Sequence, residues 1–216
     1  LYDDNPWNDV QYLFNKDVFI DNTLGVVKYT LRGQKTPDMD QYSSWAADHP
    51  VGKDYVLRNY SAPARCEDQK EFTEKDAETV RHNVEENVLD MVKAHPETTF
   101  YFYTPPYSAL WWYETKCSGD LERYFQAEQL QAELLLQYDN IKLFSFSDLF
   151  DLTCDLDNYK DYTHYSEQIS EDIVNWIHDG TYQMTEANYK SRIENMTDYY
   201  LHYDYSKSGI PLAQEK

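Results

Sequence analysis

"TTFYFYT", residues 98–104, is one of two stretches of the chain with a clear β-strand pattern. Threonine and aromatic residues fill it without a single charge, which is typical of a strand buried on both faces. A second stretch of this kind, "NIKLFSF", covers residues 140–146. A helical pattern lies between the two, and strand, helix, strand in this order predicts a parallel pair of strands.

Helical patterns surround both strands. A capping box, Thr73-x-x-Asp76, precedes valines spaced three and four apart, and Pro96 ends that helix. Asp120 is the expected cap of "LERYFQAEQLQAELLLQ", and Ser166 that of a helix closed by Gly180. A last helix carries apolar and aromatic side chains on one face, namely Tyr189, Ile193, Met196, Tyr200 and Tyr203.

The beginning of the chain has a different character. Asn5 and Pro6 are typical of a helix start, and a second helix is expected over residues 17–31. Prolines and polar residues make residues 34–70 an irregular excursion. We therefore divide the chain into a helical and irregular part (1–70), an α/β core (71–180) and a C-terminal helix with its tail (181–216).

These patterns predict the α/β class with a parallel sheet. Only two strands are evident, and two parallel strands do not make a stable domain by themselves. The chain also starts with Leu1 rather than Met. Our expectation is that the sequence is the C-terminal part of one domain, with the rest of the sheet upstream of Leu1.

Composition excludes several classes of function. A net charge of −20 argues against nucleic acid and anionic membrane surfaces as partners, because both attract clustered Lys and Arg. Cys66, Cys117 and Cys154 are odd in number and lack metal-site spacing, so we expect neither a disulfide framework nor a zinc site. No cofactor and no membrane-spanning run is indicated. No oligomeric state follows from the sequence.

"DNYKDYTHYSEQI", residues 157–169, holds the main candidate site. Asp161 and His164 lie three residues apart in a loop that follows the second strand. Chance alone gives roughly 0.6 matches to Asp-x-x-His in a chain with 23 Asp and 6 His, so the spacing itself carries little information. The place in the fold is informative, because sites gather at the carboxyl ends of parallel strands. There, Asp161 can orient His164 as a general base; the alternative is a capping or buried structural histidine.

Other candidates have simpler interpretations beside the functional one. Ser108 follows a Pro-Pro turn without a glycine, so a loop hydroxyl is preferred to a nucleophile. Tyr107, Trp111 and Trp112 either line a substrate cleft or pack in the core. Aspartates at 148, 151, 155, 157 and 161 lack the glycine and the glutamate of an EF-hand loop, so a solvated acidic loop is preferred to calcium binding.

Three stretches resemble the SGNH (GDSL-like) hydrolase superfamily, and more closely a group of uncharacterised SGNH-like bacterial surface proteins. They are "YDDNPWNDVQYLFNKDV", "FYFYTPPYSALWWYE" and "LDNYKDYTHYSEQI", the last being the most specific. The resemblance implies a three-layer α/β/α fold, serine-based ester chemistry, an extracytoplasmic location and an N-terminal membrane anchor outside this chain. It assigns Asp161 and His164 as acid and base, and it places Asn5 or Asn8 near an oxyanion position.

The family's serine belongs to a Gly-x-Ser type turn after the first strand, and no such segment occurs here. The expected function is therefore the base-bearing part of a serine ester hydrolase or O-acyltransferase. Its substrate would be an acyl ester on an extracellular molecule, for example a cell-envelope glycan. The alternative is a non-catalytic surface or binding module that kept the fold and lost the chemistry.

Overall fold

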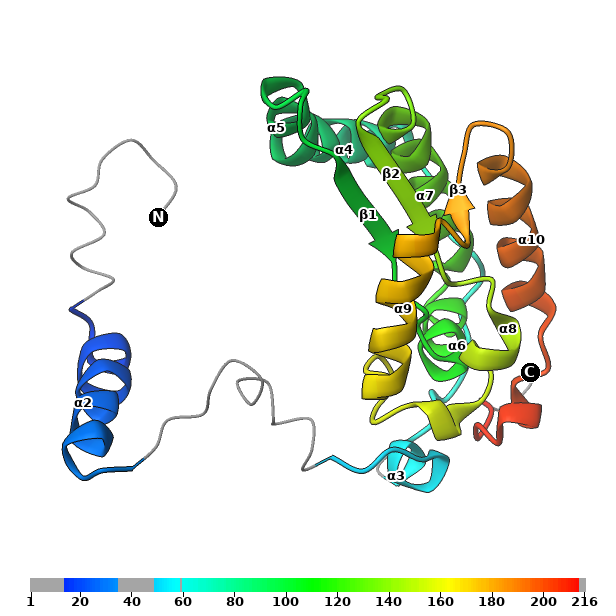
Figure 1. The fold of residues 1–216 in the computed structure, drawn as a ribbon. Coiled ribbons are helices and arrows are strands. Elements are labelled where there is room, and N and C mark those ends of the chain that lie inside the picture. Colours follow the sequence, from blue (N-terminus) through cyan, green and yellow to red (C-terminus); the bar gives the residue numbers. More distant parts are fainter. Residues whose placement is uncertain (1–13, 35–48, 59, 214–216) are drawn as a thin grey trace. The chain divides into compact units, whose positions relative to one another are not determined.

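The computed structural model describes residues 14–34, 49–58 and 60–213, with the backbone alone for Asp21 and Asn22. The chain divides into two compact units, Leu1–His49 and Pro50–Lys216, and each is described by itself. Figure 1 shows that the sheet and most of the helices belong to the second unit. The fold is of the mixed α/β type and mostly helical.

The described part of the first unit is helical. A π-helical segment, Lys16–Thr23, continues into helix α2, Leu24–Leu31. The Asn15 side chain caps its start by accepting a hydrogen bond from the backbone N–H of Val18 at 2.8 Å. The helix predicted over residues 17–31 is thus confirmed.

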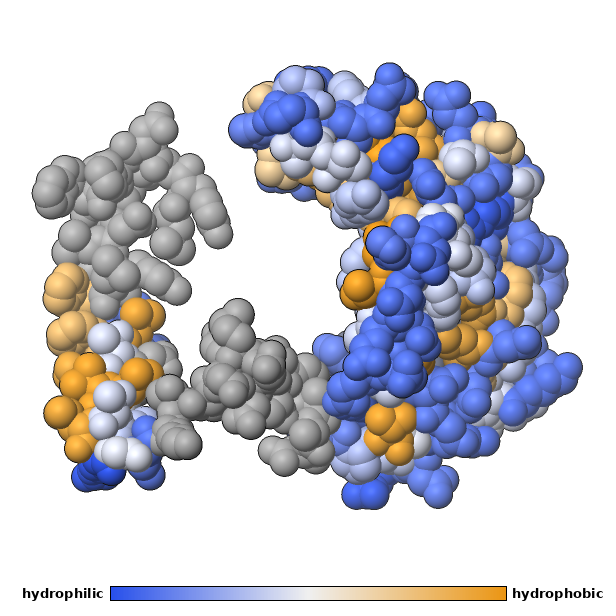
Figure 2. Space-filling model, viewed as in Figure 1, coloured by the Kyte–Doolittle hydropathy of each residue, from blue (hydrophilic) through white to orange (hydrophobic). Residues whose placement is uncertain are grey.

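Apolar side chains gather along this helical segment (Figure 2), and helix α2 buries none of its residues within its own unit. The exposed large apolar residues are Phe14, Ile20, Leu24, Val26, Val27, Tyr29 and Leu31. The helix expected to start at Asn5 and Pro6, and the candidates Asn5 and Asn8, lie outside the described residues.

A three-stranded sheet organises the second unit. Strands β1 (Phe100–Thr104) and β2 (Ile141–Ser145) pair in parallel, with Phe100 opposite Ile141. Strand β3 (Gln183–Met184) pairs with β2, so that the order is β1-β2-β3. The two predicted strands and their parallel pairing are confirmed.

The prediction of a purely parallel sheet was wrong, because β3 runs antiparallel to β2. Helix α9 (Glu167–Asp179) is followed by Gly180 in the left-handed conformation, and Tyr182 also has a positive φ of 65°. The chain reverses there and lays Met184 beside Leu143. A strand of two residues is too short to show a periodic pattern, so the sequence did not predict β3.

Burial of β1 on both faces was also a wrong expectation. Phe100, Phe102 and Thr104 face the core, whereas Tyr101 and Tyr103 on the other face are 55% and 47% exposed. The physical reason is the position of β1 at the edge of the described sheet. The helix on the face of Tyr101 and Tyr103 is α9, and it packs against Phe144 of the neighbouring strand β2.

The helices of the second unit are α3 (Lys53–Leu57), α4 (Glu74–Val84), α5 (Asp90–Ala94), α6 (Ala109–Cys117), α7 (Leu121–Leu135), α8 (Phe150–Thr153), α9 (Glu167–Asp179) and α10 (Tyr189–His202). A π-helical turn, Glu85–Leu89, joins α4 to α5. Two short 3-10 turns, Leu156–Asn158 and Tyr205–Ser208, complete the described elements.

Most of the predicted helix ends are confirmed. Thr73 and Asp76 form a reciprocal capping box at the start of α4, and Ser166 caps α9 by accepting from the N–H of Ile169. Asp120 does precede α7, but its side chain makes no capping bond. It pairs with the Nζ of Lys70 at 2.9 Å instead.

Helices pack on both faces of the sheet (Figure 1). On one face, Leu143 of β2 joins a large core to which α6, α7 and α10 contribute Trp112, Phe125 and Tyr200. On the other face, Ile169 and Ile173 of α9 pack with Phe144 and Phe146. The carboxyl ends of β1 and β2 emerge between these two layers.

A disulfide links Cys66 and Cys117, although the number and spacing of the cysteines indicated no disulfide framework. The two residues are 51 positions apart, a separation that carries no sequence signature. Backbone hydrogen bonds hold the same contact, from the N–H of Glu67 to the carbonyl of Cys117 and from Lys70 to Gly119. Disulfides persist in oxidising compartments, so this one fits a location outside the cytoplasm. Within the described residues, no helix has both the length and the apolar character that crossing a membrane requires.

Candidate functional site

A tight loop after the second strand holds the candidate pair. Tyr159 and Tyr165 form an antiparallel bridge, and the N–H of Lys160 donates to the carbonyl oxygen of His164 at 2.7 Å. Next to this bridge, the N–H of Ser166 donates to the carbonyl oxygen of Asn158 at 3.0 Å, just before α9 begins. These hydrogen bonds fix the two ends of the loop, and Asp161 and His164 lie between them.

Asp161 makes two contacts with His164 and a backbone contact with the neighbouring Thr163. Its Oδ1 accepts the backbone N–H groups of Thr163 and His164, each at 2.8 Å. Its Oδ2 lies 2.7 Å from Nδ1 of His164. A carboxylate is an acceptor only, so a neutral His164 bonded in this way carries its proton on Nδ1 and its lone pair on Nε2. This is the tautomer that a general base needs.

The electrostatics of Asp161 fit this geometry. Partial burial by itself raises the pKa of its carboxyl, but the backbone N–H groups of His164 and Thr163 and the His164 side chain lower it more. The net pKa is below the ordinary value, because these bonds favour the charged form. Asp161 is therefore an ionised carboxylate at neutral pH.

Neither of the structural alternatives for His164 describes its surroundings. Its side chain is 56% exposed, so it is not a buried core histidine. The cap of α9 is Ser166, so His164 does not cap that helix. The pair lies on the surface, in the loop that connects β2 to α9.

The loop after β1 lies against this loop, as parallel strands require. The Tyr159 hydroxyl donates to the carbonyl of Pro106 at 2.7 Å, and the Ser108 hydroxyl donates to the carbonyl of Tyr162 at 2.7 Å. Ser108 is fully buried and also caps α6 by accepting from the N–H of Trp111. A hydroxyl in these bonds has a structural role, which is the preferred interpretation from the sequence.

The three aromatic candidates are placed differently from one another. Trp112 is fully buried, stacks on Phe125, and donates its Nε1–H to the carbonyl of Tyr107. Trp111 is half-buried and stacks on Tyr107 at 4.6 Å between ring centroids. Tyr107 lines a cavity. Trp112 thus packs in the core, one of the two interpretations that the sequence left open.

The acidic residues near the loop have local partners. Asp148 makes a bidentate ion pair with Arg192. Asp157 accepts the backbone N–H of Lys53 at 2.8 Å. Asp155 accepts the N–H of Asp157 at 3.0 Å. Within the described residues, no group of three or more His, Cys, Asp or Glu side chains is arranged to hold a metal ion.

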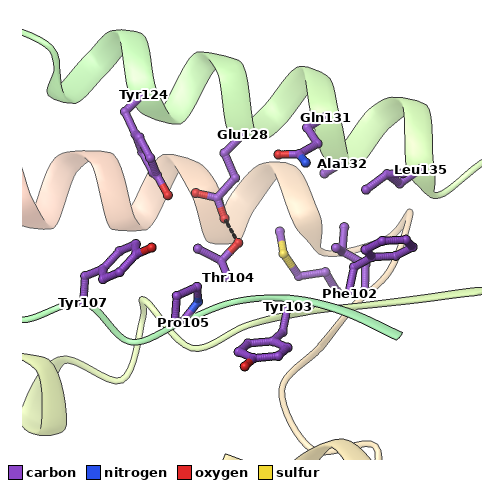
Figure 3. A pocket seen from close by; sticks show the side chains of 12 residues that line it. Phe102, Tyr103, Thr104, Pro105, Tyr107, Tyr124, Glu128, Gln131, Ala132 and Leu135 are labelled. Carbon is purple, nitrogen blue, oxygen red and sulfur yellow. Dashed lines mark hydrogen bonds between the residues drawn. The ribbon is translucent and has the colours of Figure 1, made fainter. Parts of the chain in front are cut away.

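Sequence reasoning missed one polar residue, Glu128. It lies on the buried stripe of α7 and lines the same cavity as Tyr107 (Figure 3). A signal for it exists, since a charged residue interrupts the apolar spacing of Leu121, Phe125, Ala132 and Leu135. Charged residues are rarely buried without a reason.

Comparisons with known proteins leave the site to be interpreted from its geometry. No protein-family model matches the chain, and neither the curated proteins nor the solved structures give a significant match.

Proposed function

We propose that this chain is the histidine- and aspartate-bearing part of an SGNH-like serine hydrolase or O-acyltransferase. The observation that carries the proposal is the 2.7 Å contact between Nδ1 of His164 and Oδ2 of Asp161. It is supported by the place of the pair, in an exposed loop after the second parallel strand. Helices on both faces of the sheet are compatible with the three-layer fold that the resemblance implies.

In this proposal each side chain has one role. A serine oxygen from outside these 216 residues attacks the acyl carbonyl, and Nε2 of His164 takes the serine proton. The imidazolium then returns that proton to the leaving alcohol oxygen as its bond to the acyl carbon breaks. Water or an acceptor hydroxyl completes the reaction by attacking the acyl-enzyme. Asp161 keeps the imidazole in one tautomer and stabilises its positive charge.

The substrate class follows from charge and compartment. The disulfide between Cys66 and Cys117 fits an oxidising environment, where cell-envelope glycans carry acyl esters. A net charge of −20 disfavours polyanionic substrates, so the proposed substrate is an ester on a neutral or cationic molecule. Attachment to a membrane, in this proposal, is through an anchor outside this chain.

Turnover of small activated esters by the longest natural form of the protein tests the proposal. We expect His164→Ala to lower kcat/KM by roughly 10²-fold or more, the scale for loss of a general base. His178→Ala is the matched control, because His178 is exposed on α9 and away from the loop. Equal activity of both variants, or a protein without any turnover, would favour the non-catalytic binding module.

A further inference from the structure

A cavity of about 240 Å³ lies between helix α7 and strand β1. In Figure 3, Tyr124 and Glu128 reach from α7 toward Thr104 and Tyr107, which belong to β1 and to the segment after it. The cavity is smaller than a site for a drug-sized molecule. It has room for a small ligand or for the end of a longer one.

Glu128 is the unusual residue of this cavity. Glu128 is only 8% exposed to solvent. Its Oε1 accepts a hydrogen bond from the Thr104 hydroxyl at 2.9 Å. The other oxygen, Oε2, is buried without a hydrogen-bond partner among the described residues. A buried polar atom without a partner destabilises the fold, and more so when it is charged. Such an atom in the wall of a cavity indicates a missing donor.

The charge around Glu128 shows what kind of donor is missing. Burial raises the pKa of its carboxyl to about 7, although the Thr104 hydroxyl, the charge of Arg192 and the Ser145 hydroxyl act in the opposite direction. The guanidinium N–H groups of Arg192 donate to other acceptors, namely both carboxylate oxygens of Asp148 and the carbonyl oxygens of Ser145 and Tyr182. No Lys, Arg or His is among the described residues that line the cavity. When Glu128 is ionised, a positive charge inside the cavity has to come from a ligand.

The two ends of the cavity differ in polarity. Glu128, Thr104 and the hydroxyls of Tyr107 and Tyr124 lie toward one end. Phe102, Ala132 and Leu135 lie toward the other end, together with the amide of Gln131 (Figure 3). An ammonium group offers three N–H donors, which match one carboxylate oxygen and two phenol oxygens. An aliphatic chain of a few carbons matches the apolar end.

We propose that this cavity binds the primary ammonium group and short alkyl stem of an organic amine, with Oε2 of Glu128 as the principal acceptor. The proposal does not rest on ester chemistry at His164. The hydroxyls of Tyr107 and Tyr124 complete the shell around the ammonium, and the residues of the apolar end enclose the alkyl stem.

Calorimetric titration with n-pentylamine at pH 7 tests the proposal, with n-pentanol as the neutral probe of similar shape. We expect saturable binding of the amine, and at least tenfold weaker binding of the alcohol. Because Glu128 is partly protonated at this pH, amine binding should release protons. The apparent enthalpy should therefore differ between phosphate and MOPS buffers.

Three variants locate the site. Glu128→Gln keeps the shape and removes the charge, and we expect at least tenfold weaker amine binding together with loss of proton release. Tyr124→Phe removes one acceptor and should weaken binding by a smaller factor. Glu133→Gln, at an exposed position of α7, removes the same charge and should change nothing.

Circular dichroism establishes that each variant is folded. Equal affinity for pentanol and pentylamine, unchanged amine affinity in folded Glu128→Gln, or no saturable binding to the wild-type chain would each overturn the proposal.

Discussion

Nδ1 of His164 lies 2.7 Å from Oδ2 of Asp161, while the other oxygen of the same carboxylate accepts two backbone N–H groups of the loop. One carboxylate therefore shapes the turn and orients the imidazole at the same time. A catalytic role and a structural role for Asp161 make different predictions for the same substitution.

Asp161→Asn separates these two roles. An asparagine oxygen can still accept the N–H groups of Thr163 and His164, so the loop should keep its shape, as judged by an unchanged melting temperature. The amide cannot stabilise an imidazolium, so ester turnover by the longest natural form of the protein should fall by roughly 10²- to 10⁴-fold. Asp179→Asn, at an exposed position of α9, is the control for loss of one charge. A lower melting temperature with unchanged turnover would assign Asp161 to the turn alone.

Glu128 should make the stability of the fold depend on pH. Its carboxyl has a pKa of about 7 in the folded chain against an ordinary value of 4.5, so the folded state holds a proton that the unfolded state has released. The free energy of unfolding should therefore decrease as the pH rises from about 4.5 to 7, by up to roughly 3 kcal/mol from this group. Urea unfolding at several pH values measures it. Glu128→Gln should remove this decrease, and parallel pH profiles of wild type and variant would contradict the assignment.

The disulfide should stabilise the fold by restricting the unfolded chain. Closing a loop across 51 positions corresponds to about 4 kcal/mol of unfolding free energy in the chain-entropy relation. The double variant Cys66→Ser/Cys117→Ser should lose an amount of this order in denaturant unfolding. Cys154→Ser is the control, since Cys154 is outside the disulfide and should respond only through its local packing. If reductant leaves the wild-type midpoint unchanged, the bridge does not stabilise the fold.

Ser108→Ala should destabilise the fold without affecting ester turnover. The buried hydroxyl caps α6 and donates to the carbonyl of Tyr162, so its loss should cost about 1–2 kcal/mol. Thermal unfolding and ester turnover are measured side by side. Turnover that disappears while the melting temperature stays constant would make Ser108 a nucleophile, contrary to its contacts.

Local patterns predicted the local structure well. Thr73 with Asp76, and Ser166 with Gly180, marked helix ends that the structure confirms, because caps depend on neighbours in the sequence. β-forming composition also located β1 and β2 to within two residues.

Long-range relationships were not accessible in the same way. The antiparallel β3, the exposure of Tyr101 and the disulfide of Cys66 with Cys117 depend on tertiary contacts. At the candidate site, the spacing of Asp161 and His164 indicated the pair, while the contacts of Asp161 with Thr163 and His164 required a folded loop. Glu128 was missed because sequence reasoning followed the loops and passed over the buried face of α7.

The rate of labelling by a fluorophosphonate measures directly whether His164 activates a serine. This reagent reacts with a nucleophilic serine that a neighbouring base has activated. In the longest natural form of the protein, we expect one labelled serine, located outside residues 1–216, and a labelling rate that falls by roughly 10²-fold in His164→Ala. His178→Ala should be labelled at the wild-type rate. Labelling that is equally fast in His164→Ala and wild type, or no labelled serine at all, would contradict a catalytic role for the pair of His164 and Asp161.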